Sequence, residues 1–455
     1  MIETGNDVDA LARDLFPGGV ELGRGQIART RQLVESRSPI LYQPAFETER
    51  FSTACDILVF NASTAVYDLY EVKASTNGDD KAAKNELYTD DIAFQANVLA
   101  ECNVPLGVLY LVRLNSDYVR GDELDIRSLF SVEDFTVRFK DVQAHVLERM
   151  NGAFEFVSRP HQPSGPCDCI YKGRSAHCTT FQVSNPDVPS YSVHDISRIG
   201  SSKKKLADLV DRHILAIEDV PDYFELSDIQ SRQVQCAKSG REVVDSDAIE
   251  ALLSSYQFPL AFFDYETYPA AIPRFRGYGP FDQIPFQFSL DVLTTPDGEV
   301  QHFEFLDTAP GAPDLRLIEA LQAFMPPRGS IVTWNKQFEI GINKKLAVRE
   351  PQSASFLDGL NARVVDLMEV FSSQAYVHPG FKGRTSIKYI LPVLVPELSY
   401  AELDVKEGGT ASQTWNAIVT GNLAADEAAT KKAALLTYCA PDTRAMWEIW
   451  RVLMK

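Results

Sequence analysis

The apolar run LAFFDYET at residues 260–267 carries two carboxylates, Asp264 and Glu266, at alternate positions. The length and composition of this run are typical of a buried β-strand, on which side chains two positions apart point to the same face. Two like charges buried on one face are costly unless a cation compensates them, and metal ions are the usual compensation. The run therefore predicts a strand with a metal site on one of its faces.

A new α/β pattern begins at Pro259, and we assign residues 257–455 to one C-terminal domain. After the first strand, the pattern predicts further strands at 286–293, 300–306 and 330–334, with a helix before the last of them. The remainder of the domain is predicted to be mainly helical. A first strand, a hairpin pair, and then a helix and a strand indicate a ribonuclease-H-like mixed sheet.

Two further pieces of the C-terminal domain carry side chains that suit the same chemistry. Tyr438 and Asp442 are four residues apart, which places both on one face of a helix, and Pro441 must then lie near the first turn of that helix. Glu339 ends the stretch WNKQFE, where a strand is predicted to run into a helix. The plain alternative is an acidic edge strand followed by an unrelated C-terminal helix.

In this order, the residues resemble the motifs of the DEDD exonucleases, the DnaQ-like group. The first motif of that group is D-x-E, as in Asp264 and Glu266, and the third is Y-x-x-x-D, which marks the tyrosine subtype. The second motif normally ends in Phe-Asp, whereas this chain has Glu339, which is one methylene longer. Such enzymes also have residues comparable to Asp366 and Lys388.

The resemblance implies that two metal ions, Mg²⁺ or Mn²⁺, take part in phosphodiester hydrolysis. It makes Asp264, Glu266 and Asp442 the metal ligands, with Glu339 as a longer substitute for the fourth carboxylate. It also gives Tyr438 the role of orienting the attacking water, because a phenol with a pKa of ~10 is a hydrogen-bond partner before it is a base.

A second constellation of charged residues lies near the N-terminus. The pattern predicts strands at 54–60 and 67–75, and the second of them carries Glu71 and Lys73 on one face. Asp56 joins them if the two strands pair. Two carboxylates can hold a divalent ion, and an ammonium group can stabilise charge that develops on phosphorus. The plain alternative is a surface ion pair on a half-solvated strand.

Together with a helix predicted at 89–101 and a buried strand predicted at 105–114, these residues resemble the PD-(D/E)XK core of RecB-like nucleases. That superfamily includes the CRISPR-associated RecB-like exonucleases. Gln95 matches the glutamine that commonly follows this core. Two positions depart from the pattern, because Leu99 replaces a frequent tyrosine and Gln43 stands where a glutamate is expected.

Three of the seven cysteines, Cys167, Cys169 and Cys178, lie close together in PCDCIYKGRSAHC. RecB-like nucleases of this kind often bind a four-iron cluster, which needs four thiolates. Three interpretations stay open: the fourth ligand is missing from the start of the sequence, His161 or His177 completes a zinc site, or the cluster has degenerated. Three unrelated buried cysteines are the plain alternative.

The formal net charge of -19 weighs against tight nonspecific binding to long duplex DNA, because phosphate affinity comes largely from Lys and Arg. Bound divalent ions nevertheless reverse the local charge of clustered carboxylates. The start of the sequence has no signal-peptide pattern, and the chain has no apolar run of the ~20 residues that cross a bilayer. We therefore predict a cytoplasmic protein with nucleic acid, and not a membrane, as its partner.

From about Val8 to Trp450, the chain resembles an uncharacterised bacterial family that fuses a RecB-like module to a DnaQ-like module. We predict a RecB-like domain at 1–157, an irregular Cys-containing segment at 158–190 and a helical connector at 191–256, all before the C-terminal domain.

The expected function is a metal-dependent nuclease that acts on DNA, on single strands or ends. An RNA-processing exonuclease with the same carboxylates is the first alternative. A non-catalytic nucleic-acid-binding protein with decayed sites is the second, and the departures at Gln43, Leu99 and Glu339 favour it.

Overall fold

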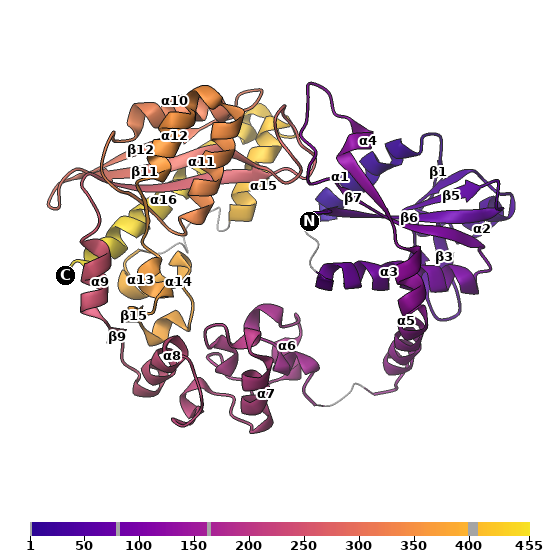
Figure 1. Ribbon diagram of the computed structural model, residues 1–455, viewed down its shortest axis with the longest axis horizontal. Helices are drawn as coiled ribbons and strands as arrows, with labels where there is room; N and C mark the ends of the chain where they lie inside the picture. The colour runs from indigo at the N-terminus through magenta and orange to yellow at the C-terminus, as the bar shows by residue number, and fades with distance from the viewer. Residues whose placement is uncertain (1, 79–81, 162–164, 399–407) are drawn as a thin grey trace. The chain divides into compact units, whose positions relative to one another are not determined.

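The computed structural model describes residues 2–78, 82–161, 165–398 and 408–455. The chain divides into two compact units, the first made of Met1–Gln162 and Pro269–Asp282 and the second of Pro163–Tyr268 and Gln283–Lys455. Each unit combines helices with a mixed sheet, so the predicted α/β class is confirmed (Figure 1). In the part of the chain that is described, no helix has both the length and the apolar character needed to cross a membrane.

The first unit is built on a six-stranded sheet with the order β1-β2-β5-β6-β7-β8. Its strands are β1 (Val20–Glu21), β2 (Ile40–Tyr42), β5 (Ile57–Asn61), β6 (Val66–Thr76), β7 (Leu106–Leu114) and β8 (Phe130–Asp134), and a separate ribbon joins β3 (Ala45–Glu47) to β4 (Ser52–Ala54). The helices are α1 (Ile2–Ala12), η1 (Arg13–Leu15), α2 (Ile27–Glu35), α3 (Ala82–Glu101), α4 (Ile126–Leu129) and α5 (Thr136–Val157). Strands β5 and β6 form an antiparallel pair, whereas β6 and β7 are parallel.

Side chains that alternate along these strands pack into two apolar cores, one on each face of the sheet. Leu58 and Leu69 pack with buried residues of α3 and α5 on one face, and Ile57 and Val72 pack with Val8 of α1 on the other. A one-residue offset between neighbours on a strand therefore decides which helix layer a side chain meets. Asp56, two positions before Leu58, and Glu71 and Lys73, at alternate positions after Leu69, therefore all face the layer that contains α3.

The predicted strand 54–60 is divided in the structure, and Asp56 lies between β4 and β5 and not within a strand. The interruption is held by backbone hydrogen bonds to the preceding loop, since Cys55 N donates to Pro44 O at 3.1 Å and Gln43 N donates to Asp56 O at 2.8 Å. Gln43 has a left-handed backbone, with φ of 52°, which turns the chain sharply at this point.

Residues 269–282 differ from the sequence-based division, which placed them in the C-terminal domain. They pack instead on the first unit, where Arg120 N donates to Tyr278 O at 3.0 Å and Gly277 N donates to Arg120 O at 2.9 Å. The Arg120 guanidinium also donates to Pro273 O at 2.7 Å. Apolar side chains of this segment, Ala271 and Ile272 among them, join the core around α1.

The second unit is built on a five-stranded sheet with the order β12-β11-β10-β13-β14. Its strands are β10 (Leu260–Pro269), β11 (Gln283–Leu293), β12 (Val300–Leu306), β13 (Ile331–Thr333) and β14 (Val364–Asp366), and β9 (Val243–Val244) pairs with β15 (Tyr376–Val377) in a ribbon. Strands β10, β13 and β14 run parallel, whereas β11 and β12 are antiparallel. The later strands thus lie on one side of β10 and the antiparallel pair on the other.

Helices cover both faces of this sheet (Figure 1). The helices of this part are α9 (Ser246–Leu253), α10 (Asp314–Phe324), α11 (Gln337–Arg349), η7 (Pro351–Ser353), α12 (Ala354–Asn361), α13 (Glu369–Ser372), η8 (Pro379–Phe381), α14 (Ile387–Leu394), α15 (Gly408–Val419) and α16 (Ala425–Leu453). Leu260 and Phe262 of β10 pack in the core that contains α9, α14 and α16, whereas Ala261, Phe263 and Tyr265 pack in the core that contains α10, α11 and α12. Alternation then directs the side chains of positions 264 and 266 to the α16 side.

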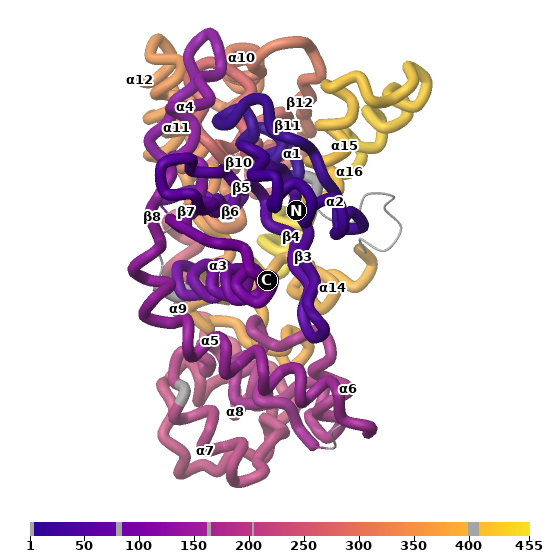
Figure 2. Tube along the Cα trace, turned by 90° about the vertical axis from the view of Figure 1, so that its right-hand side faces the viewer, coloured from indigo at the N-terminus to yellow at the C-terminus, as the bar shows by residue number. Residues whose placement is uncertain are grey.

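Residues 165–240 form a cluster of short helices within the second unit, visible in both Figure 1 and Figure 2. Its elements are η2 (Asp168–Tyr171), η3 (Arg174–Ala176), α6 (Phe181–Ser184), η4 (Val193–Asp195), η5 (Ile199–Ser201), α7 (Lys203–Asp211), η6 (Ile217–Asp219) and α8 (Asp228–Ser239). They share one apolar core, which includes Phe181, Leu206 and Val234. The segment and the connector that the sequence suggested as separate parts are therefore packed together.

Candidate functional site

The second unit brings together acidic side chains from three elements. Asp264 and Glu266 lie on β10, Asp442 lies on α16, and Glu339 lies in the first turn of α11. The charges of Asp442, Glu266 and Glu339 are all close enough to raise the pKa of Asp264. The four carboxylates, of which Asp264 and Asp442 are 178 positions apart in the chain, thus form one cluster, which we call the β10–α16 cluster.

Helix α16, which carries Asp442, is anchored to strand β11 by two side-chain contacts. Gln287 donates from Nε2 to Leu435 O at 2.8 Å, and the hydroxyls of Ser289 and Thr443 are 2.8 Å apart. Pro441 lies inside this long helix, so the prediction that it sits near a first turn is wrong. A proline in a helix interior costs a backbone hydrogen bond, and packing against the sheet on both sides of it holds the helix in place.

Glu339 is positioned by a loop that Asp366 organises. The Asp366 carboxylate accepts hydrogen bonds from the backbone N–H groups of Asn335 at 3.0 Å, Lys336 at 3.1 Å and Met368 at 3.0 Å. Asn335 has a left-handed backbone, with φ of 79°, so these bonds stabilise a turn that would otherwise be strained. Glu339 is 2% exposed, and its Oε2 is buried without a hydrogen-bond partner.

Burial and mutual repulsion disfavour ionisation throughout this cluster. Burial raises the pKa of Asp264 well above its usual range, and Asp442 raises it further. Burial also raises the pKa of Glu266 to about 8, with a further increase from Asp442 that Lys388 opposes. For Glu339, burial likewise raises the pKa to about 8. Such shifts are expected where a compensating cation is needed.

Tyr438 lies on α16, one turn before Asp442. Burial raises the pKa of its phenol above the usual range, and the charges of Glu266, Asp442 and Asp264 raise it further. The phenol therefore keeps its proton at neutral pH and can donate a hydrogen bond, but it cannot serve as a base.

The donor set fits the divalent cation that the resemblance implies. Carboxylate oxygens are the preferred ligands of Mg²⁺ and Mn²⁺, and the unpartnered oxygen of Glu339 is an acceptor that the protein alone leaves unsatisfied. One neighbour was missed by sequence reasoning: the ligand atoms of Asp264, Glu266 and Cys439 all lie within 4.8 Å of one another. The spacing Cys439 to Asp442, three residues on a helix, is the signal that identifies it.

The first unit brings together the residues predicted for its own cluster, Asp56, Glu71, Lys73 and Gln95, and adds Asp91 of α3, which was missed. Lys73 Nζ donates to Glu71 Oε1 at 2.7 Å and also forms an ion pair with Asp91. Gln95 donates from Nε2 to Glu71 Oε2 at 2.7 Å. An acidic residue four positions before Gln95 on a helix was a usable signal for Asp91.

Hydrogen bonds engage all four carboxylate oxygens of Asp56 and Glu71. Asp56 accepts from Gln43 Nε2 at 3.0 Å and from Val72 N at 2.7 Å, and Glu71 accepts from Lys73 and Gln95. Burial still raises the pKa of Asp56 to about 6 and that of Glu71 to about 8. We call this group the β6–α3 cluster.

The two departures from the RecB-like pattern have structural roles in this unit. Gln43 occupies one oxygen of Asp56, as described above, and Leu99 is fully buried in the core between the sheet and α3. A further carboxylate, Asp9 of α1, raises the pKa of Asp56, and one of its own oxygens is paired with Arg13 at 2.6 Å. Its other oxygen is buried without a partner.

The three clustered cysteines lie in the second unit, with all three Sγ atoms within 4.8 Å of one another. Cys178 is exposed, and its hydrogen bond with Thr180 and contacts with the other thiols lower its pKa to about 7. Among the described residues, no fourth His, Cys, Asp or Glu joins this trio. The trio thus offers three of the four ligands that an iron–sulfur cluster or a structural zinc ion needs, and a site of either kind stays a prediction.

The histidines considered for that site have other contacts. The ring of His177 stacks on Phe181 with centroids 3.5 Å apart, and its Nε2 lies 2.9 Å from Lys172 O. His161 belongs to the first unit and is not placed relative to the trio.

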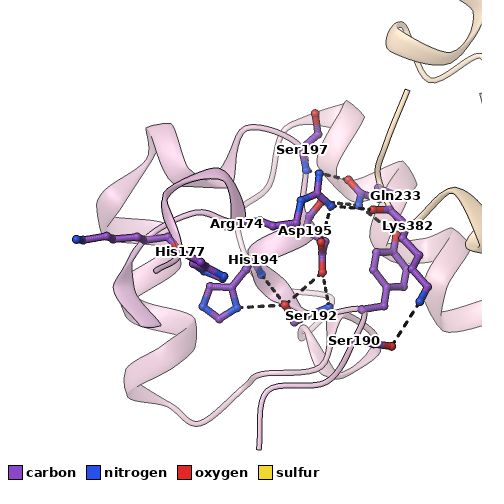
Figure 3. Close-up of polar contacts among 11 residues, drawn as sticks. Arg174, His177, Ser190, Ser192, His194, Asp195, Ser197, Gln233 and Lys382 are labelled. Atoms are coloured by element: carbon purple, nitrogen blue, oxygen red, sulfur yellow. Dashed lines mark hydrogen bonds and ion pairs between the residues drawn. The ribbon is translucent and has the colours of Figure 1, made fainter. Parts of the chain in front are cut away.

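A second polar group beside the trio has the composition of a hydrolase triad but not its geometry (Figure 3). Ser192 Oγ lies 3.1 Å from Nδ1 of His194 and 3.3 Å from Asp195 Oδ2, and His194 Nε2 lies 2.7 Å from the Ile170 carbonyl. Ser192 is buried and caps the turn η4, while Asp195 pairs with Arg174 at 2.5 Å. These contacts stabilise the fold of the helical cluster.

A family model described as a domain of unknown function (DUF2779) matches residues 261–386. The matched stretch includes Asp264, Glu266 and Glu339 and ends before α14 and α16. It fits the uncharacterised family that the sequence analysis expected, and it carries no information on a nuclease fusion. No curated protein and no solved structure matches the chain.

Proposed function

We propose that this chain is a divalent-metal-dependent nuclease that hydrolyses phosphodiester bonds of DNA, with the β10–α16 cluster as an exonuclease site for single strands or ends. Three observations carry the proposal: ligand atoms of Asp264 and Glu266 lie within 4.8 Å of each other, the charges of Asp442 and Glu339 reach Asp264, and one oxygen of Glu339 is buried without a hydrogen-bond partner. The sheet order, with an antiparallel pair on one side of β10 and parallel strands on the other, supports the ribonuclease-H-like assignment of this unit.

In this assignment, Asp264, Glu266 and Asp442 hold Mg²⁺ or Mn²⁺, and the bound cation supplies charge stabilisation to a scissile phosphate. Glu339 completes the ligand set directly or through a water. Tyr438, which keeps its proton, orients the attacking water by a hydrogen bond and does not take its proton. Lys388, whose charge reaches Glu266, balances part of the negative charge when a phosphate is absent.

The β6–α3 cluster is proposed as the RecB-like site of the first unit, with Asp56 and Glu71 as metal ligands and Lys73 and Gln95 beside them. A specific observation favours a second candidate here, a decayed site that stabilises the fold. All four oxygens of the two ligands already accept hydrogen bonds, and Lys73 is held by two carboxylates. A metal must displace some of these contacts before it binds.

The proposal is tested by incubating the full chain with end-labelled single-stranded DNA, duplex DNA and RNA, with Mg²⁺, with Mn²⁺ and with a chelator. We expect metal-dependent shortening of DNA from its ends. The variant Asp264→Asn should abolish it, and Asp291→Asn should not, because Asp291 is a buried carboxylate paired with His302 outside the cluster.

Preferred degradation of RNA in the same assay would favour the RNA-processing alternative. The proposal of a nuclease fails if no nucleic acid is degraded with either metal, or if Asp264→Asn and Lys73→Ala both keep full activity.

A further inference from the structure

Cys439 is the one thiol in the described chain whose ligand atom lies within 4.8 Å of both Asp264 and Glu266 ligand atoms. It is 1% exposed and lies on α16 beside Tyr438. Sequence reasoning from the carboxylates alone gave it no role. Its position thus adds a sulfur donor to a cluster otherwise described by oxygen donors.

The backbone around Cys439 is fixed on both sides. One anchor is the hydrogen bond from Gln287 to the Leu435 carbonyl at 2.8 Å, and the other is the contact of Ser289 with Thr443 at 2.8 Å. The thiol therefore stays next to the carboxylates without any rearrangement of the helix. Preorganised donors of this kind lose little freedom when they bind a ligand.

A second observation points to a ligand in this cluster. Glu339, 2% exposed, has a buried Oε2 without a hydrogen-bond partner, and its charge reaches Asp264. The charges that act on Asp264 from Asp442, Glu266 and Glu339 are all negative. A ligand that suits this cluster is therefore a cation, which would have carboxylate oxygens and one sulfur within reach.

We propose that Cys439 is a metal ligand, and that the β10–α16 cluster is a mixed oxygen–sulfur site that binds cations of the Zn²⁺ class more tightly than Mg²⁺. Thiolate ligands favour Zn²⁺ and similar cations, whereas Mg²⁺ takes oxygen ligands. On binding, the Sγ–H proton is released to solvent and a sulfur–metal bond forms, so net charge and atoms are conserved. The inference rests on the proposed metal site of the nuclease and specifies which cation that site prefers.

The test uses Co²⁺ as a spectroscopic substitute for Zn²⁺ on the full chain. A sulfur-to-Co²⁺ charge-transfer band reports a cysteine ligand directly, without any substrate. The Cys167 trio contributes equally to every variant, so the informative quantity is the difference between the parent chain and Cys439→Ala. Cys236→Ala is the matched control, because Cys236 is also 1% exposed in the same unit but lies in neither ligand group.

We expect Cys439→Ala, and also Asp264→Asn, to remove the same increment of the charge-transfer band and to weaken Zn²⁺ binding at least about tenfold. Cys236→Ala should leave both unchanged. Cys439→Ser, which keeps the shape of the side chain more closely, serves if thermal unfolding shows that Cys439→Ala does not fold.

A band and a Zn²⁺ affinity that are unchanged in folded Cys439→Ala and Cys439→Ser overturn the inference. This failure is distinct from failure of the proposed function. A chain that degrades DNA with Mg²⁺ but lacks the Cys439-dependent band keeps the function and loses the inference. A chain that shows the band but degrades no nucleic acid keeps the inference and loses the function.

Discussion

In the first unit, both oxygens of Asp56 and both oxygens of Glu71 accept hydrogen bonds, whereas in the second unit Asp264 and Glu266 face further carboxylates and Glu339 has a buried oxygen with no partner. The glutamates of both clusters nevertheless have a pKa raised to about 8. Raised pKa values therefore do not distinguish the two clusters, but their hydrogen-bond partners do.

The two clusters differ in how far cations of the chain itself offset their carboxylates. In the β6–α3 cluster, Lys73 sits between Glu71 and Asp91, and Arg13 pairs with Asp9, so cations from the chain itself offset much of the negative charge. In the β10–α16 cluster, the cation that acts on Glu266 is Lys388, and the neighbours that act on Asp264 are acidic. We therefore expect the second cluster to depend on a bound cation far more than the first.

Nuclease activity should differ most between variants of the two clusters. Asp264→Asn should lower the rate of DNA degradation at least about 100-fold, because loss of a metal ligand forfeits several kcal/mol of charge stabilisation and each 1.36 kcal/mol is tenfold in rate. Asp56→Asn, the matching change in the first unit, should lower it by less than about tenfold. Initial rates on end-labelled single strands measure both. A larger loss from Asp56→Asn would reverse the comparison.

The next effect concerns stability, which only the change in the first cluster should lower. Lys73→Ala leaves Glu71 and Asp91 without their cation and should destabilise the first unit by about 2 kcal/mol, below the value for a fully buried pair because Lys73 is 25% exposed. Glu266→Gln replaces a buried carboxyl group whose ionisation is disfavoured with a neutral amide, and it should leave the metal-free protein equally stable or more stable.

Chemical denaturation in the presence of a chelator measures both changes. The control is Arg149→Ala, which breaks an exposed ion pair with Asp90 in the first unit and should change stability by less than about 0.5 kcal/mol. If Glu266→Gln destabilised the protein as much as Lys73→Ala does, the chain itself would offset the carboxylates equally well in both clusters.

A smaller effect is expected in the pH dependence of stability. The pKa of Glu339 is raised from its ordinary 4.5 to about 8 on folding, so the folded state holds a proton that the unfolded state has lost between these values. Stability without metal should therefore fall as pH rises from about 5 to 8. Glu339→Gln should flatten this fall by about 1–2 kcal/mol in denaturation at each pH. An equal slope in parent and variant would contradict the raised pKa.

Much of the second unit was predictable from short patterns. Strand β12 has the predicted bounds Val300–Leu306, and β10 starts at the predicted Leu260 because an apolar run between turns leaves few alternatives. Alternation also predicted that Asp264 and Glu266 share a face, and the spacing of Tyr438 and Asp442 predicted their shared helix face.

Other features could not be read from local patterns because they depend on tertiary contacts. Residues 269–282 follow β10 directly, yet their hydrogen bonds with Arg120 assign them to the first unit. Pro441 is tolerated in mid-helix because the sheet packs against α16 on both sides of it. Helix spacing alone relates Asp91 to Gln95 and Cys439 to Asp442, and only the tertiary structure brings Asp91 to Lys73 and Cys439 to Asp264 and Glu266.

Calorimetric titration of Mn²⁺ into the full chain tests the difference between the clusters most directly. Mn²⁺ prefers carboxylate ligands and binds thiolates such as the cysteine trio only weakly. Parent protein and Asp56→Asn should bind Mn²⁺ with the same affinity, and Asp264→Asn should bind at least about tenfold more weakly. Parent-like binding by Asp264→Asn, with weakened binding by Asp56→Asn, would contradict the assignment of the cation-dependent site to the second unit.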